Sequence, residues 1–132
     1  MLHVRLEGTD VDIVHYPYPL LAQAMRSPLG VRVASLRDLA AMKLAAIARR
    51  GLRRDFWDLY AILTEGGVSF SHLLDDYHKK FGTSEADAYH VLRALVWFED
   101  AERDVMPRGL TARKWKQIRA YFEALVGAPL DT

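Results

Sequence analysis

Residues 43–59 read KLAAIARRGLRRDFWDL, and they decide the fold because they predict two helices that meet at Gly51. On both sides of the glycine, apolar residues recur every three or four positions, which is the spacing of an amphipathic helix. Glycine is a common residue at the end of a helix. A short loop between two helices makes them antiparallel neighbours, so we expect a helical hairpin here.

Lys43 lies inside the apolar stripe of the first predicted helix. At 100° per residue the stripe is roughly 140° wide, and Lys43 falls about 36° from its centre. A buried, unpaired ammonium is costly, so this side chain needs a carboxylate, a water-filled cleft or an anionic ligand. The alternative is that its aliphatic stem is buried and its amine reaches the surface. The apolar residues of the stripe are Leu36, Leu39, Ala40, Leu44 and Ile47.

Asp55 and Asp58 are three positions apart on the second predicted helix, so their carboxylates share one flank. In a helical hairpin, Lys43 and Asp55 lie on adjacent elements, and a Lys–Asp pair in a cleft suits phosphate and metal chemistry. A structural explanation also exists. Acidic residues are favoured in the first turn of a helix, and nearby arginines can pair with both carboxylates on the surface. These arginines are Arg49, Arg50, Arg53 and Arg54.

Composition predicts one soluble globular domain. The chain has 132 residues, of which 51% are hydrophobic, and its formal net charge is +1. This balance excludes attraction of the whole molecule to nucleic acid or to an anionic membrane. The absence of cysteine excludes disulfides and thiolate chemistry. Because no apolar run approaches about 20 residues and residues 1–10 lack signal-peptide features, we expect a cytoplasmic protein without a membrane anchor.

The first third of the chain predicts strands. The runs HVRLEG (3–8) and VDIVHY (11–16) suggest a β-hairpin that turns at residues 8–10. The prolines of YPYP (16–19) then favour an extended segment. A third short strand is predicted in VRVAS (31–35).

From Ser35 onward the pattern is helical, with Ser35 and Asp38 resembling a capping box. We therefore expect an α+β fold in which a small N-terminal sheet packs on a bundle of about five helices. The predicted domain covers residues 1–132, with a β-rich segment over 1–34 and a helical part over 35–127. The expected helices cover residues 36–50, 53–65, about 69–81, about 84–102 and about 111–126.

Three further features have mainly structural interpretations. The apolar run between Val91 and Phe98 is expected to be largely buried, whereas Asp75 and Asp76 are expected to be exposed. The basic residues of the last helix are expected on a solvated face, with an RNA-contacting strip as the alternative. The histidines have no metal-ligand spacing and are expected at surface or packing positions. The basic residues are Arg113, Lys114 and Lys116, and the histidines are His3, His15, His72, His78 and His90.

Residues 31–63 resemble the helical motif of the nucleotidyl transferase AbiEii/AbiGii toxin family, K-x-x-A-x-x-x-R-x-x-x-R-D-x-x-D-L. The segments DVDIVHYPYPLL (10–21) and LVWFEDAERD (95–104) are similar to flanking segments of the same family. Together these stretches cover most of the chain but correspond to the later part of the family's domain. The matching residues are Lys43, Ala46, Arg50, Arg54, Asp55, Asp58 and Leu59.

The resemblance implies a partial nucleotidyltransferase fold from the toxin half of a bacterial toxin–antitoxin or abortive-infection system that acts in phage defence. Such enzymes use carboxylate-bound Mg²⁺ and transfer a nucleotidyl group from a nucleoside triphosphate to an acceptor such as the 3′ end of tRNA. The resemblance assigns catalysis to Asp55 and Lys43, and metal binding to Asp12. It assigns nucleotide contacts to Lys43, Arg50 and Arg54, and supporting positions to Asp58 and Asp10.

One element of the superfamily is missing from this sequence. A Gly-Ser or Gly-Gly turn followed by D-x-D on a strand normally supplies the first metal ligands, and the D-x-D at Asp10 and Asp12 lacks the preceding turn. We therefore expect the chain to be the carboxyl-terminal part of a longer ancestral enzyme, inactive in nucleotide transfer on its own. The alternatives are a noncatalytic module that binds RNA or an antitoxin, and a structural remnant of the fold.

Overall fold

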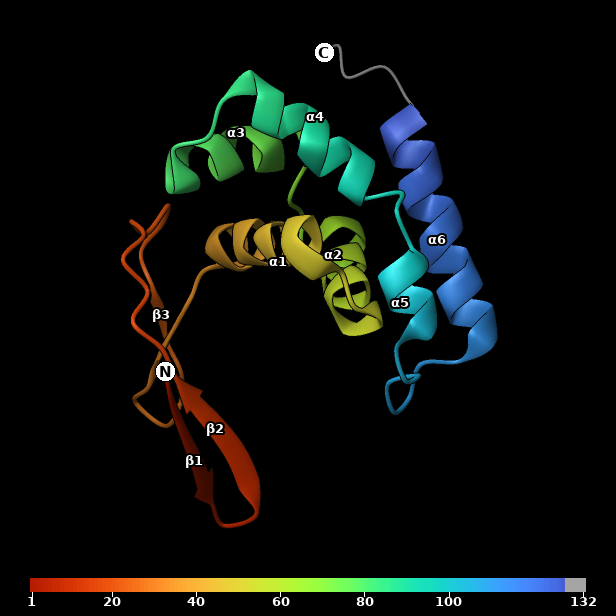
Figure 1. Cartoon of the computed structure of the whole chain (residues 1–132). Helices are drawn as coiled ribbons and strands as arrows, with labels where there is room; N and C mark the ends of the chain where they lie inside the picture. The colour runs from red at the N-terminus through yellow and green to blue at the C-terminus, as the bar shows by residue number, and fades with distance from the viewer. Residues whose placement is uncertain (128–132) are drawn as a thin grey trace.

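Two short β-hairpins precede six helices in the computed structural model of the chain (Figure 1). The structure describes residues 1–127, apart from the side chain of Glu85. The α+β prediction is confirmed. The domain boundaries stay a prediction. The last five residues of the predicted domain, 128–132, lie outside the described residues. Within residues 1–127, no helix is long and apolar enough to cross a membrane.

The first hairpin pairs β1 (Leu2–Leu6) with β2 (Thr9–Ile13) in antiparallel register. Its turn consists of Glu7 and Gly8, which both have positive φ, 48° and 82°. A two-residue turn of this kind matches the natural twist of paired strands. The turn predicted at residues 8–10 was therefore placed too late, because residues 9 and 10 belong to β2.

This hairpin extends away from the helices, at the bottom of Figure 1. Leu2, Leu6 and Ile13 on its apolar face are between 56% and 59% exposed. The expected packing of this sheet on the bundle is therefore not seen. The apolar runs correctly predicted two paired strands, although residues 7–8 and 14–16 lie outside them. Such runs contain no information about what covers the apolar face.

A second, smaller sheet pairs β3 (Met25–Arg26) with β4 (Arg32–Val33). The predicted strand over 31–35 is confirmed only for Arg32 and Val33, and its partner β3 was not predicted. The loop between them is closed by a backbone hydrogen bond from Ser27 to Val31.

The helical hairpin predicted around Gly51 is confirmed as α1 (Leu36–Arg50) and α2 (Arg53–Glu65). Gly51 has an extended conformation, with φ −73° and ψ 118°, so positive φ is not the reason for glycine. A Cβ atom at this position would lie 2.7 Å from Cε2 of the Phe56 ring. Glycine is required here because the ring packs directly against the backbone of the loop.

The remaining helices surround this hairpin. In Figure 1, α3 and α4 lie above α1, and α6 lies beside α2. Thr111 caps α6 through a hydrogen bond from the Lys114 amide. The bounds are α3 (Phe70–Phe81), α4 (Glu85–Ala94), α5 (Glu99–Arg103) and α6 (Ala112–Gly127).

The prediction of one helix over residues 84–102 is wrong, because the chain breaks between α4 and α5. Leu95 and Phe98 are buried at 0% and 7% exposure, whereas Val96 and Trp97 are 37% and 57% exposed. Four consecutive apolar residues would point around most of a helix's circumference, so one face could not bury them all. Leu95 and Phe98, three positions apart, enter the core, and Val96 and Trp97 remain outside it.

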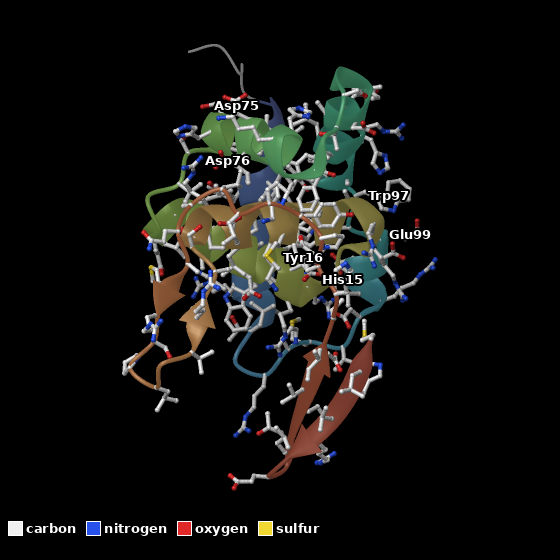
Figure 2. The ribbon with its side chains drawn as sticks, turned by 90° about the vertical axis from the view of Figure 1, so that its left-hand side faces the viewer. His15, Tyr16, Asp75, Asp76, Trp97 and Glu99 are labelled. Atoms are coloured by element: carbon white, nitrogen blue, oxygen red, sulfur yellow. The ribbon has the colours of Figure 1, made fainter. Side chains whose placement is uncertain are left out.

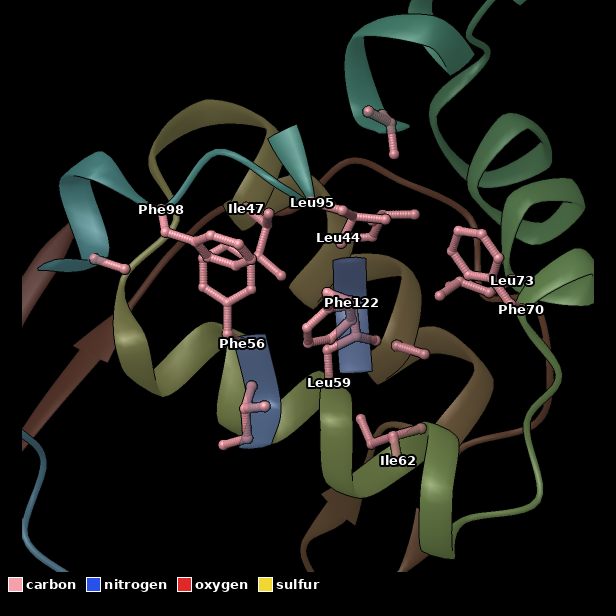
Figure 3. Packing of buried hydrophobic residues seen from close by; sticks show 14 of the residues in the cluster. Leu44, Ile47, Phe56, Leu59, Ile62, Phe70, Leu73, Leu95, Phe98 and Phe122 are labelled. Atoms are coloured by element: carbon pink, nitrogen blue, oxygen red, sulfur yellow. The ribbon is translucent and has the colours of Figure 1, made fainter. Parts of the chain in front are cut away.

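The core lies between the helices, as Figure 3 shows. Phe56 is its central aromatic residue and is fully buried. Its ring centroid lies 5.2 Å from that of Phe98, 5.9 Å from Trp115 and 5.6 Å from Phe122. These tilted and edge-to-face contacts join α2 to α6 and to the break before α5. Phe56 therefore connects the α1–α2 hairpin to the last part of the chain.

We expect Gly51→Ala to lower the free energy of unfolding by about 1–3 kcal/mol, because the added methyl group displaces the Phe56 ring from its packed position. Urea unfolding followed by circular dichroism measures the change. Gly127→Ala is the matched control, since a Cβ there meets no atom within 4 Å. Equal stabilities of the two variants would contradict this account of the loop.

Candidate functional site

Lys43 reaches from α1 to two carboxylates on α2. Its Nζ lies 2.8 Å from Oδ2 of Asp58 and 3.6 Å from Oδ1 of Asp55. The Lys43 side chain is 23% exposed, so it is mostly packed but not closed off from solvent. The sequence-based expectation that the helical hairpin brings these groups together is confirmed as geometry.

Asp55 also has a structural task. Its Oδ2 accepts a hydrogen bond of 3.2 Å from the Leu52 amide, which caps the start of α2. Its side chain is 18% exposed, against 43% for that of Asp58. Asp55 is therefore fixed in orientation by the backbone, and Asp58 is the more accessible carboxylate of the two.

A hollow of about 410 Å³ opens at the start of α2. Arg54 and Asp55 line it from the helix, and Asp104 and Arg108 line it from the loop after α5. The carbonyl of Asp104 accepts a 2.7 Å hydrogen bond from Nη1 of Arg53, which ties the loop to α2. The hollow is therefore lined by charged residues. Through Asp55 it adjoins the group formed by Lys43, Asp55 and Asp58, which we call the Lys43 cluster.

Arg50 lies elsewhere. It lines two hollows between α1, α3 and α4, of about 340 Å³ and 530 Å³, that do not include Arg54 or Asp55. The structure thus divides the predicted nucleotide contacts between two regions of the surface.

Asp10 and Asp12 are not brought to the Lys43 cluster. Both lie on the hairpin that extends away from the helices (Figure 1). Asp12 pairs with His3, and Asp10 lies 3.5 Å from Arg5 on the opposite strand. These four side chains line a separate hollow of about 390 Å³.

The described residues do not assemble a complete set of protein ligands for Mg²⁺. In residues 1–127, no three His, Asp or Glu side chains are grouped so that they could hold a metal ion. Mg²⁺ requires near-octahedral oxygen ligands, whereas Asp10 and Asp12 each already pair with a basic side chain. The metal role that the resemblance implied for Asp12 stays a prediction.

Sequence reasoning missed a buried ion pair between Asp38 of α1 and Lys80 of α3. Their side chains are 0% and 1% exposed, and Oδ1 and Nζ are 2.7 Å apart. Lys80 also donates to the Pro19 carbonyl at 2.8 Å, and Asp38 accepts the amides of Leu21 and Ala22. The pair therefore fastens the segment after β2 to two helices.

A signal for this pair was present in the sequence. Lys80 follows Leu73 and Tyr77 at helical spacing, so it belongs to the buried stripe of α3, just as Lys43 belongs to that of α1. Ser35 does cap α1 through the Asp38 amide, as predicted. The Asp38 carboxylate, however, accepts the Ser35 hydroxyl and turns toward the incoming segment, instead of capping the Ser35 amide as a capping box would.

The pKa of Asp38 reflects these contacts. Burial alone would raise it, but hydrogen bonds from Lys80, the Leu21 and Ala22 amides and the Ser35 hydroxyl lower the pKa to about 2. Asp38 is therefore ionised in the folded protein throughout the physiological range.

The prediction that Asp76 is exposed is wrong. Asp76 is 2% exposed and accepts two hydrogen bonds from Arg37, of 3.0 Å from Nε and 2.7 Å from Nη2. The Arg37 guanidinium lowers the pKa of this carboxyl. Asp75, its exposed neighbour, lies on the outer side of α3 (Figure 2). A partner on another helix reversed the usual exposure of an aspartate.

Comparison with known proteins assigns the sequence to a family. Residues 3–130 match the family described as Nucleotidyl transferase AbiEii toxin, Type IV TA system. The chain belongs to the AbiEii toxin family. The AbiEii match covers both the hairpin that carries Asp12 and the helices that carry Lys43 and Asp55.

A relative in Aquifex aeolicus (strain VF5), named only as uncharacterized protein aq_aa25, is 31% identical over 127 residues. The alignment covers 96% of this chain and 60% of that protein. The AbiEii chain described here thus spans about 60% of the length of the relative that it matches. No solved structure matches it significantly.

We expect acid to weaken the contribution of Asp38. Because its pKa in the folded chain lies below the ordinary 3.8, the stabilisation is complete above about pH 4 and is lost as the pH falls towards 2. Between about pH 6 and pH 2, the wild-type chain should lose roughly 2 kcal/mol more unfolding free energy than Asp38→Asn. Urea unfolding at both pH values measures the difference.

Asp75→Asn is the control for this experiment, because it removes an exposed carboxylate from the neighbouring helix. It should keep the pH dependence of the wild type. At neutral pH, Asp38→Asn should cost about 3–5 kcal/mol, since it leaves Lys80 buried without a counter-charge. An Asp38→Asn chain with the wild-type pH dependence would show that the ion pair is not formed in solution.

Proposed function

We propose that the chain forms the phosphate-binding wall of a nucleotidyltransferase site, with a nucleoside triphosphate as its ligand. The observation that carries this proposal is the half-buried Lys43, held between Asp55 and Asp58 at the seam of α1 and α2. Membership of the AbiEii family supports it, because nucleotide transfer requires cations near the triphosphate.

The arrangement leaves Lys43 able to bind a phosphate oxygen. An ammonium has three hydrogens, and the two carboxylates at 2.8 Å and 3.6 Å engage at most two of them. The carboxylates also orient the side chain along the helix seam, so little conformational freedom remains to be lost when a ligand binds. A lysine extended into solvent would lack this preorganisation.

Asp55 and Arg54 extend the proposed site into the hollow at the start of α2. Asp55 takes the catalytic position, with its orientation fixed by the Leu52 amide. Arg54 and Arg108 line the hollow and add cations for the phosphates, against the carboxylates of Asp55 and Asp104. Asp58 remains a supporting residue that holds Lys43.

We propose no catalytic step through Mg²⁺, because the described residues do not gather ligands for it. Transfer of a nucleotidyl group to RNA, an antitoxin partner and a cytoplasmic location are proposals that follow from the family. The expectation that the chain is inactive in transfer by itself stays a prediction.

Calorimetric titration of the purified chain with each of the four nucleoside triphosphates tests the site. We expect Lys43→Ala to weaken binding at least about 10-fold, because one charge-assisted hydrogen bond contributes about 1.5–3 kcal/mol. Lys116→Ala on the exposed face of α6 is the matched control and should bind like the wild type. Each variant is checked by circular dichroism for an unchanged fold.

Two results would refute the nucleotide site. If the wild-type chain binds no triphosphate, the alternatives of a noncatalytic module or a structural remnant are favoured. If the chain binds a triphosphate but Lys43→Ala binds it equally well, the ligand lies elsewhere and Lys43 serves only to join α1 to α2.

A further inference from the structure

A cleft runs along α1 on the side of α3 and α4. It consists of the two hollows that Arg50 lines, of about 340 Å³ and 530 Å³, which share the residues Ala48, Arg49, Arg50 and His90. The His90 Nε2 donates a 3.1 Å hydrogen bond to the Ala48 carbonyl, which ties α4 to α1 between the two hollows. The hollows are therefore adjoining parts of one surface feature, which we call the α1–α4 cleft.

The α1–α4 cleft carries unneutralised positive charge. Arg49, Arg50 and Arg93 line it, and in the part of the chain that the structure describes none of them forms an ion pair. Asp100 is the acidic residue among the described lining residues. The carboxyl ends of α1 and α4 add only about half a negative charge each. A net positive charge remains, in contrast to Lys43, which two carboxylates neutralise.

Exposed aromatic rings lie in both parts of the cleft. Trp97 lines the smaller hollow and is 57% exposed, whereas Tyr16 and Tyr18 line the larger one and are 41% and 43% exposed. Figure 2 shows Tyr16 near the middle of that view and Trp97 towards its right edge. Half-exposed rings beside arginines form the combination on which unpaired bases stack while phosphates bind the guanidinium groups.

The tyrosines are held in place before any ligand arrives. Tyr16 and Tyr18 pack edge to face at 4.9 Å, and Tyr18 packs on Phe81 of α3 at 4.8 Å. The buried Lys80 fixes the same segment through the Pro19 carbonyl and lies 5.6 Å from the Tyr16 ring. The segment that carries the two tyrosines is therefore anchored to α3 both by aromatic packing and by Lys80.

We propose that the α1–α4 cleft binds a single-stranded polynucleotide. Its phosphates contact Arg49, Arg50 and Arg93, and its bases stack on Trp97 and on the tyrosines. A duplex would keep its bases stacked on each other and could not use the rings. A mononucleotide would occupy one hollow and leave the other empty. The inference does not depend on the nucleotide site at Lys43.

Fluorescence anisotropy with a 5′-labelled 12-nucleotide oligouridylate tests the proposal. Trp97→Ala should weaken binding about 10-fold, because stacking of one base on an aromatic ring contributes about 1–3 kcal/mol. Arg93→Ala should also weaken binding and should reduce the slope of log K against log salt by about 0.7, since one phosphate contact is lost. Both side chains lie at the surface, so both variants should fold.

The controls separate this cleft from other basic surfaces. Arg113→Ala, which removes an exposed arginine from α6, should bind the oligonucleotide like the wild type. Lys43→Ala should do so within about twofold, even if it abolishes triphosphate binding, so the two proposals can fail separately. A duplex of the same length should bind at least about 10-fold more weakly than the single strand.

Any of four results with the nucleic acids would overturn the proposal. The first is that the wild type does not bind the oligonucleotide, and the second is that Trp97→Ala and Arg93→Ala bind it as tightly as the wild type. The third is that Arg113→Ala loses as much affinity as those two variants. The fourth is that the duplex binds as tightly as the single strand. Displacement of the oligonucleotide by polyglutamate at the same charge concentration would also reject it, because the cleft would then recognise acidic chains in general.

Discussion

The buried ion pair between Asp38 and Lys80 is the interaction on which the position of the N-terminal segment depends. The hairpin formed by β1 and β2 extends away from the helices, so the chain that follows it has to be anchored separately. Lys80 provides that anchor at the Pro19 carbonyl, and Asp38 provides it at the Leu21 and Ala22 amides. Because both side chains are almost completely buried, loss of either would leave an unpaired charge inside the protein.

Two lysines occupy apolar stripes in this chain, and burial distinguishes their roles. Lys80 is 1% exposed, and its contacts with a carboxylate and a carbonyl are internal. Lys43 is 23% exposed and lies between two carboxylates at the edge of a helix seam. The same pattern therefore produced a structural anchor in one helix and an accessible cation in another. Helical spacing identifies a lysine that needs a partner, but only tertiary packing decides whether solvent reaches it.

Local signals predicted the helices well, because their causes are local. The bounds of α1 and α2 agree with those expected from periodicity, from the Ser35 cap and from Gly51. The errors occur where distant residues decide the outcome. Asp76 is buried because Arg37 reaches it from another helix, and the helix predicted over residues 84–102 ends at Ala94, before a break that precedes α5. The juxtaposition of Lys43 with Asp55 was predictable because a single short loop produces it.

The distribution of charge along α1 differs between the environment of Lys43 and that of Arg49 and Arg50. Near the middle of α1, two aspartates neutralise the charge of Lys43. The affinity of this place for an anion would therefore come from a preoriented hydrogen-bond donor more than from net positive charge. At the carboxyl end of α1, next to α4, Arg49 and Arg50 keep their charge and lie beside exposed aromatic rings. A compact phosphate suits the first environment, and an extended anion with flat bases suits the second. Since Lys43 and Arg50 are two turns apart on one rigid helix, ligands at both places would be held at a fixed separation.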